Sequence, residues 1–226
     1  MDRSLVLCSA GLDSAVLVAL EARERLVQPV YVSVGLAWEA AERALLDRLV
    51  EALNCSPARA GRIAPPVRLT VGMLDVYPAA HWAVRGTPPA YDSPDEEVYL
   101  EGRNVVLLAK AAVFAAREGI SRIALGPLAA NPFPDATPEF FDTMARALSL
   151  GLDRSLQIVA PLSELHKEEV IRLGADLDVP FELTLSCMNP LDGRHCGRCS
   201  KCRERHYGFR DAGIGDPTDY ATGDKK

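Results

Sequence analysis

The chain has 226 residues, of which 48% are hydrophobic and 25% are charged, so it can bury a substantial core and is not a disordered chain. Its net charge of -6 argues against a general polyanion-binding protein. No apolar run approaches the roughly 20 residues of a membrane span, and the amino end does not read as an export signal. We therefore expect a cytoplasmic protein of one large domain, or one domain with a smaller attached unit.

The predicted elements alternate between strand and helix over the first half of the chain. Short apolar runs predict the strands, and longer amphipathic segments predict the helices. In chain order these elements occupy residues 5–8, 15–25, 30–34, 38–53, 67–71, 104–118 and 120–126. Such alternation predicts βαβ units and a doubly wound parallel sheet, an α/β fold whose ligands bind beyond the carboxyl ends of the strands.

Two proline-rich segments interrupt this alternation. Residues 73–103 predict a long loop that orders on substrate binding, and residues 127–138 predict a second loop. After them we expect a helix over residues 164–177, with Ser163 as its N-cap.

The first chemical motif is the run Ser9-Ala10-Gly11-Leu12-Asp13-Ser14, between the first strand and the first helix. Small residues at a helix N-terminus let backbone N–H groups and serine hydroxyls converge on a phosphate. Asp13 would repel phosphate, so it is better suited to hold a magnesium ion or to fix the loop. An ordinary strand-to-helix turn with serine caps remains an equal alternative.

This run resembles the S-G-G-x-D-S pyrophosphate loop of the N-type ATP pyrophosphatases, whose members adenylate a carbonyl substrate, release pyrophosphate and admit a nucleophile. Ala10 stands where that family normally has glycine. If this position requires a positive φ, alanine costs on the order of 1 kcal/mol or more. Either φ is negative at Ala10, or the loop differs from that of the family.

The second motif groups four of the six cysteines, Cys187, Cys196, Cys199 and Cys202. Such spacing suits a tetrahedral zinc ion, and four thiolates leave no open position, so we expect a structural zinc site. Free thiols and an iron-sulfur cluster are the alternatives, and the cluster is the main competitor. His195 is expected either beside the metal ligands or exposed, and not among the ligands. We place the boundary between a nucleotide-binding α/β domain and a zinc-binding C-terminal extension at residues 1–180 and 181–226.

Basic residues surround the cysteines, and two interpretations of them stay open. They balance the formal charge of -2 on a four-thiolate zinc centre, or they contact a substrate carboxylate, a nucleotide phosphate or RNA. The overall acidity of the chain does not favour RNA. The residues are Arg194, Arg198, Lys201, Arg203, Arg205 and Arg210.

Together, the two motifs resemble the 7-cyano-7-deazaguanine synthase family of queuosine-precursor synthesis, over nearly the whole chain. The resemblance implies an adenine nucleotide alpha hydrolase-like (PP-loop) fold and an ATP-dependent ligase with Mg²⁺ and Zn²⁺. It also implies small-molecule substrates, no membrane partner, and a homodimer as a candidate assembly. Its reaction would convert 7-carboxy-7-deazaguanine and ammonia to the nitrile through an adenylated carboxylate and an adenylated amide. Further pieces of the resemblance are Gly102-Arg103-Asn104, Pro134-Asp135, Pro138-Glu139-Phe140, Lys167, Thr184-Leu185-Ser186-Cys187 and Asp216-Pro217-Thr218-Asp219-Tyr220.

The resemblance also implies site residues. The residues Ser9 to Ser14, Arg103, Asn104 and Lys167 would bind ATP, and Asp13, Ser14 and Lys167 would be catalytic. Asp135 and Glu139 would share one face if helical and bind magnesium or an amidine edge. Phe133, Phe140 and Phe141 are candidates to stack a deazapurine, although at least one of them is expected in the core. Each of these polar residues has an alternative as a solvated or capping group.

One segment departs further from this family. Its members usually carry Tyr-Gly-Gln-Arg-His after the second strand, where this chain has Val34-Gly35-Leu36-Ala37-Trp38-Glu39. A site without that arginine, histidine and glutamine makes different hydrogen bonds, so a divergent member with another carboxylate or acceptor stays open. Two further alternatives are a tRNA sulfur transferase with reactive cysteines or an iron-sulfur cluster, and a non-catalytic nucleotide-binding partner protein.

Overall fold

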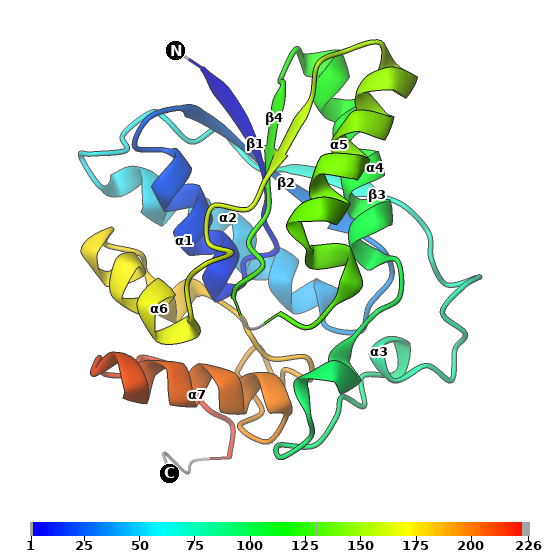
Figure 1. The fold of residues 1–226 in the computed structure, drawn as a ribbon. Coiled ribbons are helices and arrows are strands. Elements are labelled where there is room, and N and C mark those ends of the chain that lie inside the picture. Colours follow the sequence, from blue (N-terminus) through cyan, green and yellow to red (C-terminus); the bar gives the residue numbers. More distant parts are fainter. Residues whose placement is uncertain (1, 130, 223–226) are drawn as a thin grey trace.

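A five-stranded parallel sheet in the order β3-β2-β1-β4-β5 forms the centre of the molecule (Figure 1). It is seen in a computed structural model that describes residues 2–129 and 131–222. The expected doubly wound parallel sheet is thereby confirmed, and residue 130 of the expected loop 127–138 lies outside the described residues. The strands are β1 (Arg3–Leu7), β2 (Leu26–Ser33), β3 (Val67–Thr70), β4 (Arg122–Ala124) and β5 (Gln157–Val159).

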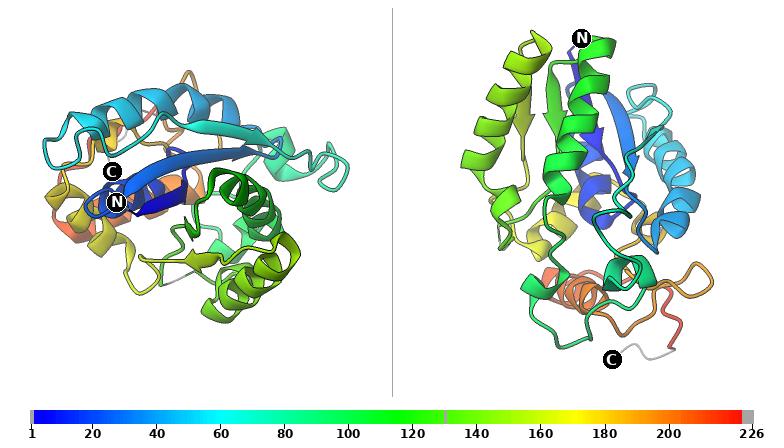
Figure 2. Two further views of the ribbon diagram at one scale, coloured as in Figure 1. Left: turned by 90° about the horizontal axis from the view of Figure 1, so that it is seen from above. Right: turned by 90° about the vertical axis from the view of Figure 1, so that its right-hand side faces the viewer.

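Helices cover both faces of the sheet because successive strand residues point to opposite sides. Val6 and Tyr31 pack in one core cluster with the helices α1 (Leu12–Glu21), α2 (Glu39–Cys55) and α6 (Lys167–Asp176). Leu5 and Val30 pack in another with α4 (Arg103–Glu118) and α5 (Pro138–Leu152). Figure 2 shows the two helical layers on either side of the strands.

The start of one helix differs from the prediction. Helix α6 begins at Lys167 and is capped by His166, because the side chain of Glu169 accepts the backbone N–H of His166 at 2.7 Å in a capping box. The expected N-cap Ser163 is therefore wrong, since it lies in a turn in which its own N–H bonds to the carbonyl of Ala160.

The elements that were not predicted include α5, β5 and the helix α7 (Ser200–Ala212). Thr137 caps α5 by accepting the N–H of Phe140 at 3.2 Å, with Pro138 at the first helical position, so a capping signal was present. The strand β5 has only three residues, and α7 is too rich in charge for apolar periodicity to reveal it.

The segment 73–103 lies at the carboxyl end of the sheet and packs as a covering layer. It contains the short helix α3 (Trp82–Arg85) and a 3₁₀ turn at Asp95–Val98. Trp82 stacks on Trp38 with ring centroids 5.9 Å apart, and the hydroxyl of Tyr77 donates to the carbonyl of Glu101 at 2.7 Å.

The C-terminal part of the chain returns to the same end of the sheet. Helix α7 packs along α6, and Gly208 permits this contact because an added Cβ would meet Lys167 Cγ at 2.5 Å (Figure 1). The backbone N–H of Leu185 donates to the carbonyl of Ala10 at 2.9 Å. No described helix has the length and apolar character needed to cross a membrane.

Candidate functional site

The loop after β1 lies where the sheet order reverses, between β1 and β4, which is where ligands bind in open α/β sheets. Ala10 has a φ of 59°, so this position is left-handed although it carries a Cβ, and the expected alternative of a negative φ is wrong. The Ser14 hydroxyl donates to the carbonyl of Gly11 at 2.9 Å, and the Gly11 N–H donates to Ser9 Oγ at 3.3 Å. Helix α1 begins at Leu12, so Asp13 and Ser14 belong to its first turn.

An ion-pair chain ties this loop to the C-terminal helices. Lys167 Nζ lies 2.8 and 2.7 Å from the two carboxylate oxygens of Asp13 and 2.6 Å from Glu204 Oε1, and Lys201 Nζ lies 2.5 Å from Glu204 Oε2. Burial alone would lower the pKa of Lys167, but the two carboxylates hold that pKa above its ordinary value. Burial would raise the pKa of Glu204, and the two lysines lower it instead. The phosphate-type loop therefore adjoins a cationic group that is already in place.

A hollow of about 300 Å³ opens beside the loop at the carboxyl ends of β1, β2 and β4. A smaller hollow of about 220 Å³ reaches from the loop to Lys167 and Glu204. Both are lined by Ser9, Gly11, Asp13, Glu42 and Arg103, so together they form one site, which we call the sheet-end pocket.

The start of α4 contributes to the sheet-end pocket and is held by the loop after β4. Asp135 Oδ2 accepts the backbone N–H of Asn104 at 3.0 Å, and Asn104 Nδ2 donates to the Asp135 carbonyl at 2.9 Å. Burial raises the pKa of Asp135, and the hydrogen bonds oppose that rise. Arg103 Nε is buried without a hydrogen-bond partner in the described part of the chain. Asp135 therefore caps α4, and Arg103 retains an unused donor.

Two glutamates of α2 also line the pocket, and sequence reasoning missed both. Glu42 is buried, and its Oε2 accepts the Tyr31 hydroxyl at 2.7 Å. Burial raises the pKa of Glu42 to about 7, although Arg103 lowers it. Glu39 Oε1 accepts the N–H groups of Val34 and Gly35 at 2.8 and 3.0 Å. A glutamate pair at the start of a helix that follows a strand is the signal that could have revealed these residues.

The divergent segment 35–39 builds the core beneath the 73–103 layer. Leu36 and Trp38 are each 5% exposed and pack with Met73, Ala83 and other apolar residues. The apolar side chains of this segment therefore support the packing of the covering layer. The polar groups facing the sheet-end pocket from this region are those of α2.

The predicted aromatic and acidic substrate residues are separated by the fold. Phe133 lines the sheet-end pocket and stacks on Tyr99, with centroids 5.0 Å apart. Phe140 and Phe141 pack instead in the core between the sheet, α4 and α5. Glu139 is exposed on the first turn of α5, and an extended Thr137 separates it from the 3₁₀ turn of Asp135. Asp135 and Glu139 therefore do not share a helical face, and Glu139 does not line the pocket.

The structure brings the four clustered cysteines together in a buried candidate metal centre. Their Sγ atoms all lie within 4.8 Å of one another, and Cys196 and Cys199 lie 3.9 and 3.5 Å from Cys202. Tetrahedral ligands at about 2.3 Å from zinc would stand about 3.8 Å apart, so the set fits that ion. His195 is buried, and its Nε2 accepts the N–H of Ser186 at 3.0 Å. It adjoins the cluster as a hydrogen-bonding group and not as a fifth ligand.

Two of the basic side chains near the cysteines hold parts of the fold together. Arg205 is buried and donates to Thr218 Oγ1, Thr184 Oγ1 and the Phe181 carbonyl at 2.6, 2.8 and 2.9 Å. Arg203 pairs with Asp95 at 3.1 Å. These contacts fasten α7 to the chain on either side of the cysteine loop and to the 73–103 layer.

The matching family model is described as queuosine biosynthesis protein QueC and covers residues 3–213. The chain is 36% identical over 230 residues to a 7-cyano-7-deazaguanine synthase of Methanothrix thermoacetophila, covering 97% of this chain and 99% of that relative. A synthase of the same name from Anaeromyxobacter dehalogenans is 36% identical over 229 residues, covering 97% and 96%. A solved structure described as a predicted subunit of tRNA methyltransferase from Methanocaldococcus jannaschii aligns with a TM-score of 0.50 and 14% identity, covering 96% of this chain and 90% of that one.

Proposed function

Since this chain belongs to the family of the queuosine biosynthesis protein QueC, we propose that it is an ATP-dependent 7-cyano-7-deazaguanine synthase. The substrate carboxylate of 7-carboxy-7-deazaguanine attacks the α-phosphate of ATP and releases pyrophosphate, and ammonia then displaces AMP to give an amide. A second ATP adenylates the amide oxygen, and loss of AMP with two protons leaves the nitrile. The observation that carries the proposal is the phosphate-type loop at the sheet reversal, joined through Asp13 to Lys167.

The roles proposed for the loop follow from its position. Residues 9–14 hold the phosphates, with Ser9 and Ser14 as hydroxyl donors and the N-terminus of α1 as a source of positive potential. Lys167 stabilises the departing pyrophosphate from its place beside Asp13. Asp13 would hold Mg²⁺, which neutralises phosphate charge when bound.

The substrate side of the proposed site is the sheet-end pocket. Arg103 brings a guanidinium whose Nε has no hydrogen-bond partner among the described residues, a donor suited to a phosphate or carboxylate. Asn104 stands beside it, at the start of the same helix. Phe133 offers a ring for stacking a deazapurine, and Asp135 orients the helix through its bonds to Asn104. Glu139 lies outside the pocket and takes no role here.

We also propose that residues 1–180 form the ATP-binding domain and residues 181–226 a zinc-binding extension that supports it. Residues 1 and 130 of the first range, and 223–226 of the second, lie outside the described residues. The hydrogen bond between Leu185 and Ala10 and the ion pair between Glu204 and Lys167 support a joint site. Zinc, when bound by the four cysteines, supplies structural cross-linking, and Arg205 adds hydrogen bonds within the extension, to Thr184, Thr218 and the Phe181 carbonyl.

A second candidate is a divergent enzyme of the same chemistry that adenylates a different carboxylate. The observation that favours it is the exchange of a polar segment for Leu36 and Trp38, with Glu42 facing the pocket from the next helical turn.

The test is incubation with ATP, Mg²⁺, ammonia and 7-carboxy-7-deazaguanine, followed by mass spectrometry for the amide and nitrile and by measurement of AMP. The proposal predicts both products and two AMP per nitrile. AMP without either product would contradict the substrate and retain the adenylation chemistry. ATP binding without AMP formation would identify a non-catalytic nucleotide-binding protein. Ser14→Ala should reduce AMP formation, and Ser149→Ala, remote from the pocket, serves as its control.

A further inference from the structure

A second concave site lies on the outer side of α7, separate from the sheet-end pocket. It has a volume of about 550 Å³ and shares no lining residue with either hollow of that pocket. We call it the α7 groove. The side chains that give it its chemical character are Tyr91, Arg198, His206, Tyr207, Arg210 and Tyr220.

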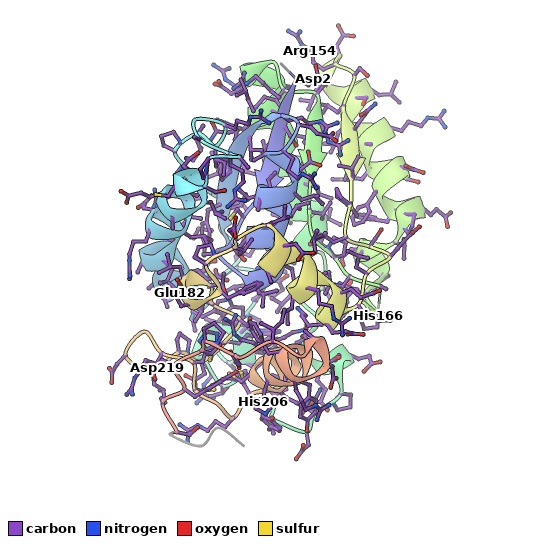
Figure 3. All side chains as sticks on the ribbon, turned by 90° about the vertical axis from the view of Figure 1, so that its left-hand side faces the viewer. Asp2, Arg154, His166, Glu182, His206 and Asp219 are labelled. Carbon is purple, nitrogen blue, oxygen red and sulfur yellow. The ribbon has the colours of Figure 1, made fainter. Side chains whose placement is uncertain are left out.

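The helical period explains how α7 serves both sides. Gly208 and Phe209 face α6 and the core. His206, Tyr207 and Arg210 lie on the opposite face, with positions 206 and 210 one turn apart. Figure 3 shows His206 on the side of α7 that points away from α6.

Aromatic rings and an arginine are already stacked in the groove. The Arg210 guanidinium carbon lies 4.4 Å from the centroid of the Tyr207 ring, and Tyr91 meets the same ring edge-on at 6.4 Å. Tyr207 is 40% exposed. These contacts with Arg210 and Tyr91 limit the rotamer freedom that the Tyr207 ring has left to lose on binding a planar ligand.

The charge of the groove is positive, whereas the chain as a whole is acidic. None of its lining residues is a carboxylate, and two are arginines. Lys201 and Arg203 of the same segment are engaged with Glu204 and Asp95. Arg198 is exposed and has no ion pair within residues 2–129 and 131–222. Within the described part of the chain, Arg210 pairs with the exposed Asp211, a contact that contributes little in water.

We propose that the α7 groove binds a nucleotide, with its base on Tyr207 and its phosphate on Arg198 and Arg210. Tyrosine faces accept any base by stacking, and guanidinium groups match phosphate geometry. The groove volume lies within the range of small-molecule sites and accommodates one nucleotide. Free nucleotides and nucleotides within single-stranded RNA present this same chemistry. The proposal is independent of the reaction at the sheet-end pocket.

The test measures binding of UMP by calorimetry and of a fluorescently labelled oligouridylate by anisotropy, at two salt concentrations. Tyr207→Ala should weaken binding roughly tenfold, and Tyr207→Phe should retain it. Arg198→Ala should also weaken binding and flatten its salt dependence. Arg194→Ala removes an equally exposed arginine outside the groove and should leave binding unchanged. If the two probes bind with equal affinity, the ligand of the groove is a free nucleotide. If oligouridylate binds more tightly than UMP, the ligand is a single strand of RNA.

Several outcomes would overturn the assignment. One is that neither UMP nor oligouridylate binds. Another is that the Arg194 and Arg198 variants lose the same affinity for the probes. A third is that correctly folded Tyr207→Ala protein keeps the affinity of the wild type. A dimer that Tyr207→Ala dissociates, with no affinity for either probe, would identify the groove as a contact between copies. Ser14→Ala should impair ATP turnover and leave the binding of UMP and oligouridylate intact. The proposal for the groove and the proposal for the reaction are therefore tested separately. Melting temperature and metal content of each variant verify its fold.

Discussion

Lys167 donates to both carboxylate oxygens of Asp13, at 2.8 and 2.7 Å, across 154 positions of sequence. The contact joins the first residue of α6 to the first turn of α1. Asp13 belongs to the loop at residues 9–14, and Lys167 lies beside it. The ion pair therefore links the packing of α6 on α1 to the geometry of that loop.

Replacing Lys167 by methionine should destabilise the fold and impair AMP formation. Lys167 is only 15% exposed, so its loss leaves Asp13 without a partner and takes one of two cations from Glu204. We expect a loss of roughly 2 kcal/mol in the free energy of unfolding, less than for a fully buried pair. Urea denaturation measures it, with Lys110→Met on α4 as the control. Equal stability of the two variants would show that the ion pair contributes nothing.

Glu42→Gln should remove a pH dependence of stability. The pKa of Glu42 rises to about 7 in the folded chain from an ordinary value of 4.5, so folding favours its protonated form. Stability from this group is complete below pH 4.5 and falls as the pH rises to 7, by roughly 3 kcal/mol. Without ATP, the wild type should lose stability over this interval and the variant should lose less. Glu51→Gln, exposed on the same helix, should behave like the wild type.

The cysteine cluster should bind one zinc per chain. Cys199→Ser should release that metal and lower the melting temperature by about 10 °C, which for a chain of this size corresponds to a few kcal/mol. Cys55, which is exposed and outside the cluster, supplies the control as Cys55→Ser. Elemental analysis that finds iron with labile sulfide would replace the zinc assignment by a cluster. Retention of both metal and melting temperature in Cys199→Ser would contradict a structural role.

Ala10→Gly should reveal strain stored in the loop. The left-handed conformation of Ala10 costs roughly 1–2 kcal/mol, and glycine relieves it while losing a buried methyl worth roughly 0.8 kcal/mol and some chain entropy. We expect a net change below about 1 kcal/mol. Ala19→Gly, equally buried but in helix α1, should cost roughly 2 kcal/mol because no strain is relieved. Equal losses in thermal or chemical denaturation would show that the Ala10 conformation is unstrained.

Local patterns revealed part of the site because their information lies within a few residues. The loop 9–14, a helix from about Asn104 and the four-cysteine set were predicted from runs and spacings. The structure places the loop before α1, begins the helix at Arg103 and gathers the four Sγ atoms within 4.8 Å of one another. The Ser163 cap was wrong because a serine before a helix cannot be told from a serine in a preceding turn. Helix α7 was missed because polar residues lie on both its packed face and its outer face, so the helix has no apolar periodicity that the sequence could reveal.

The sequence by itself determined the parallel α/β architecture, the small-residue loop at residues 9–14 and the four-cysteine set, because periodicity and spacing are local properties. Only the tertiary structure decided which charges meet. It paired Lys167 with both Asp13 and Glu204 and joined Glu42 to the Tyr31 hydroxyl by a hydrogen bond. It also gave Asp135 a capping role and left Glu139 exposed. Those partnerships depend on the strand order and on the packing of α6 against α1 and α7, which bring distant residues within hydrogen-bonding distance.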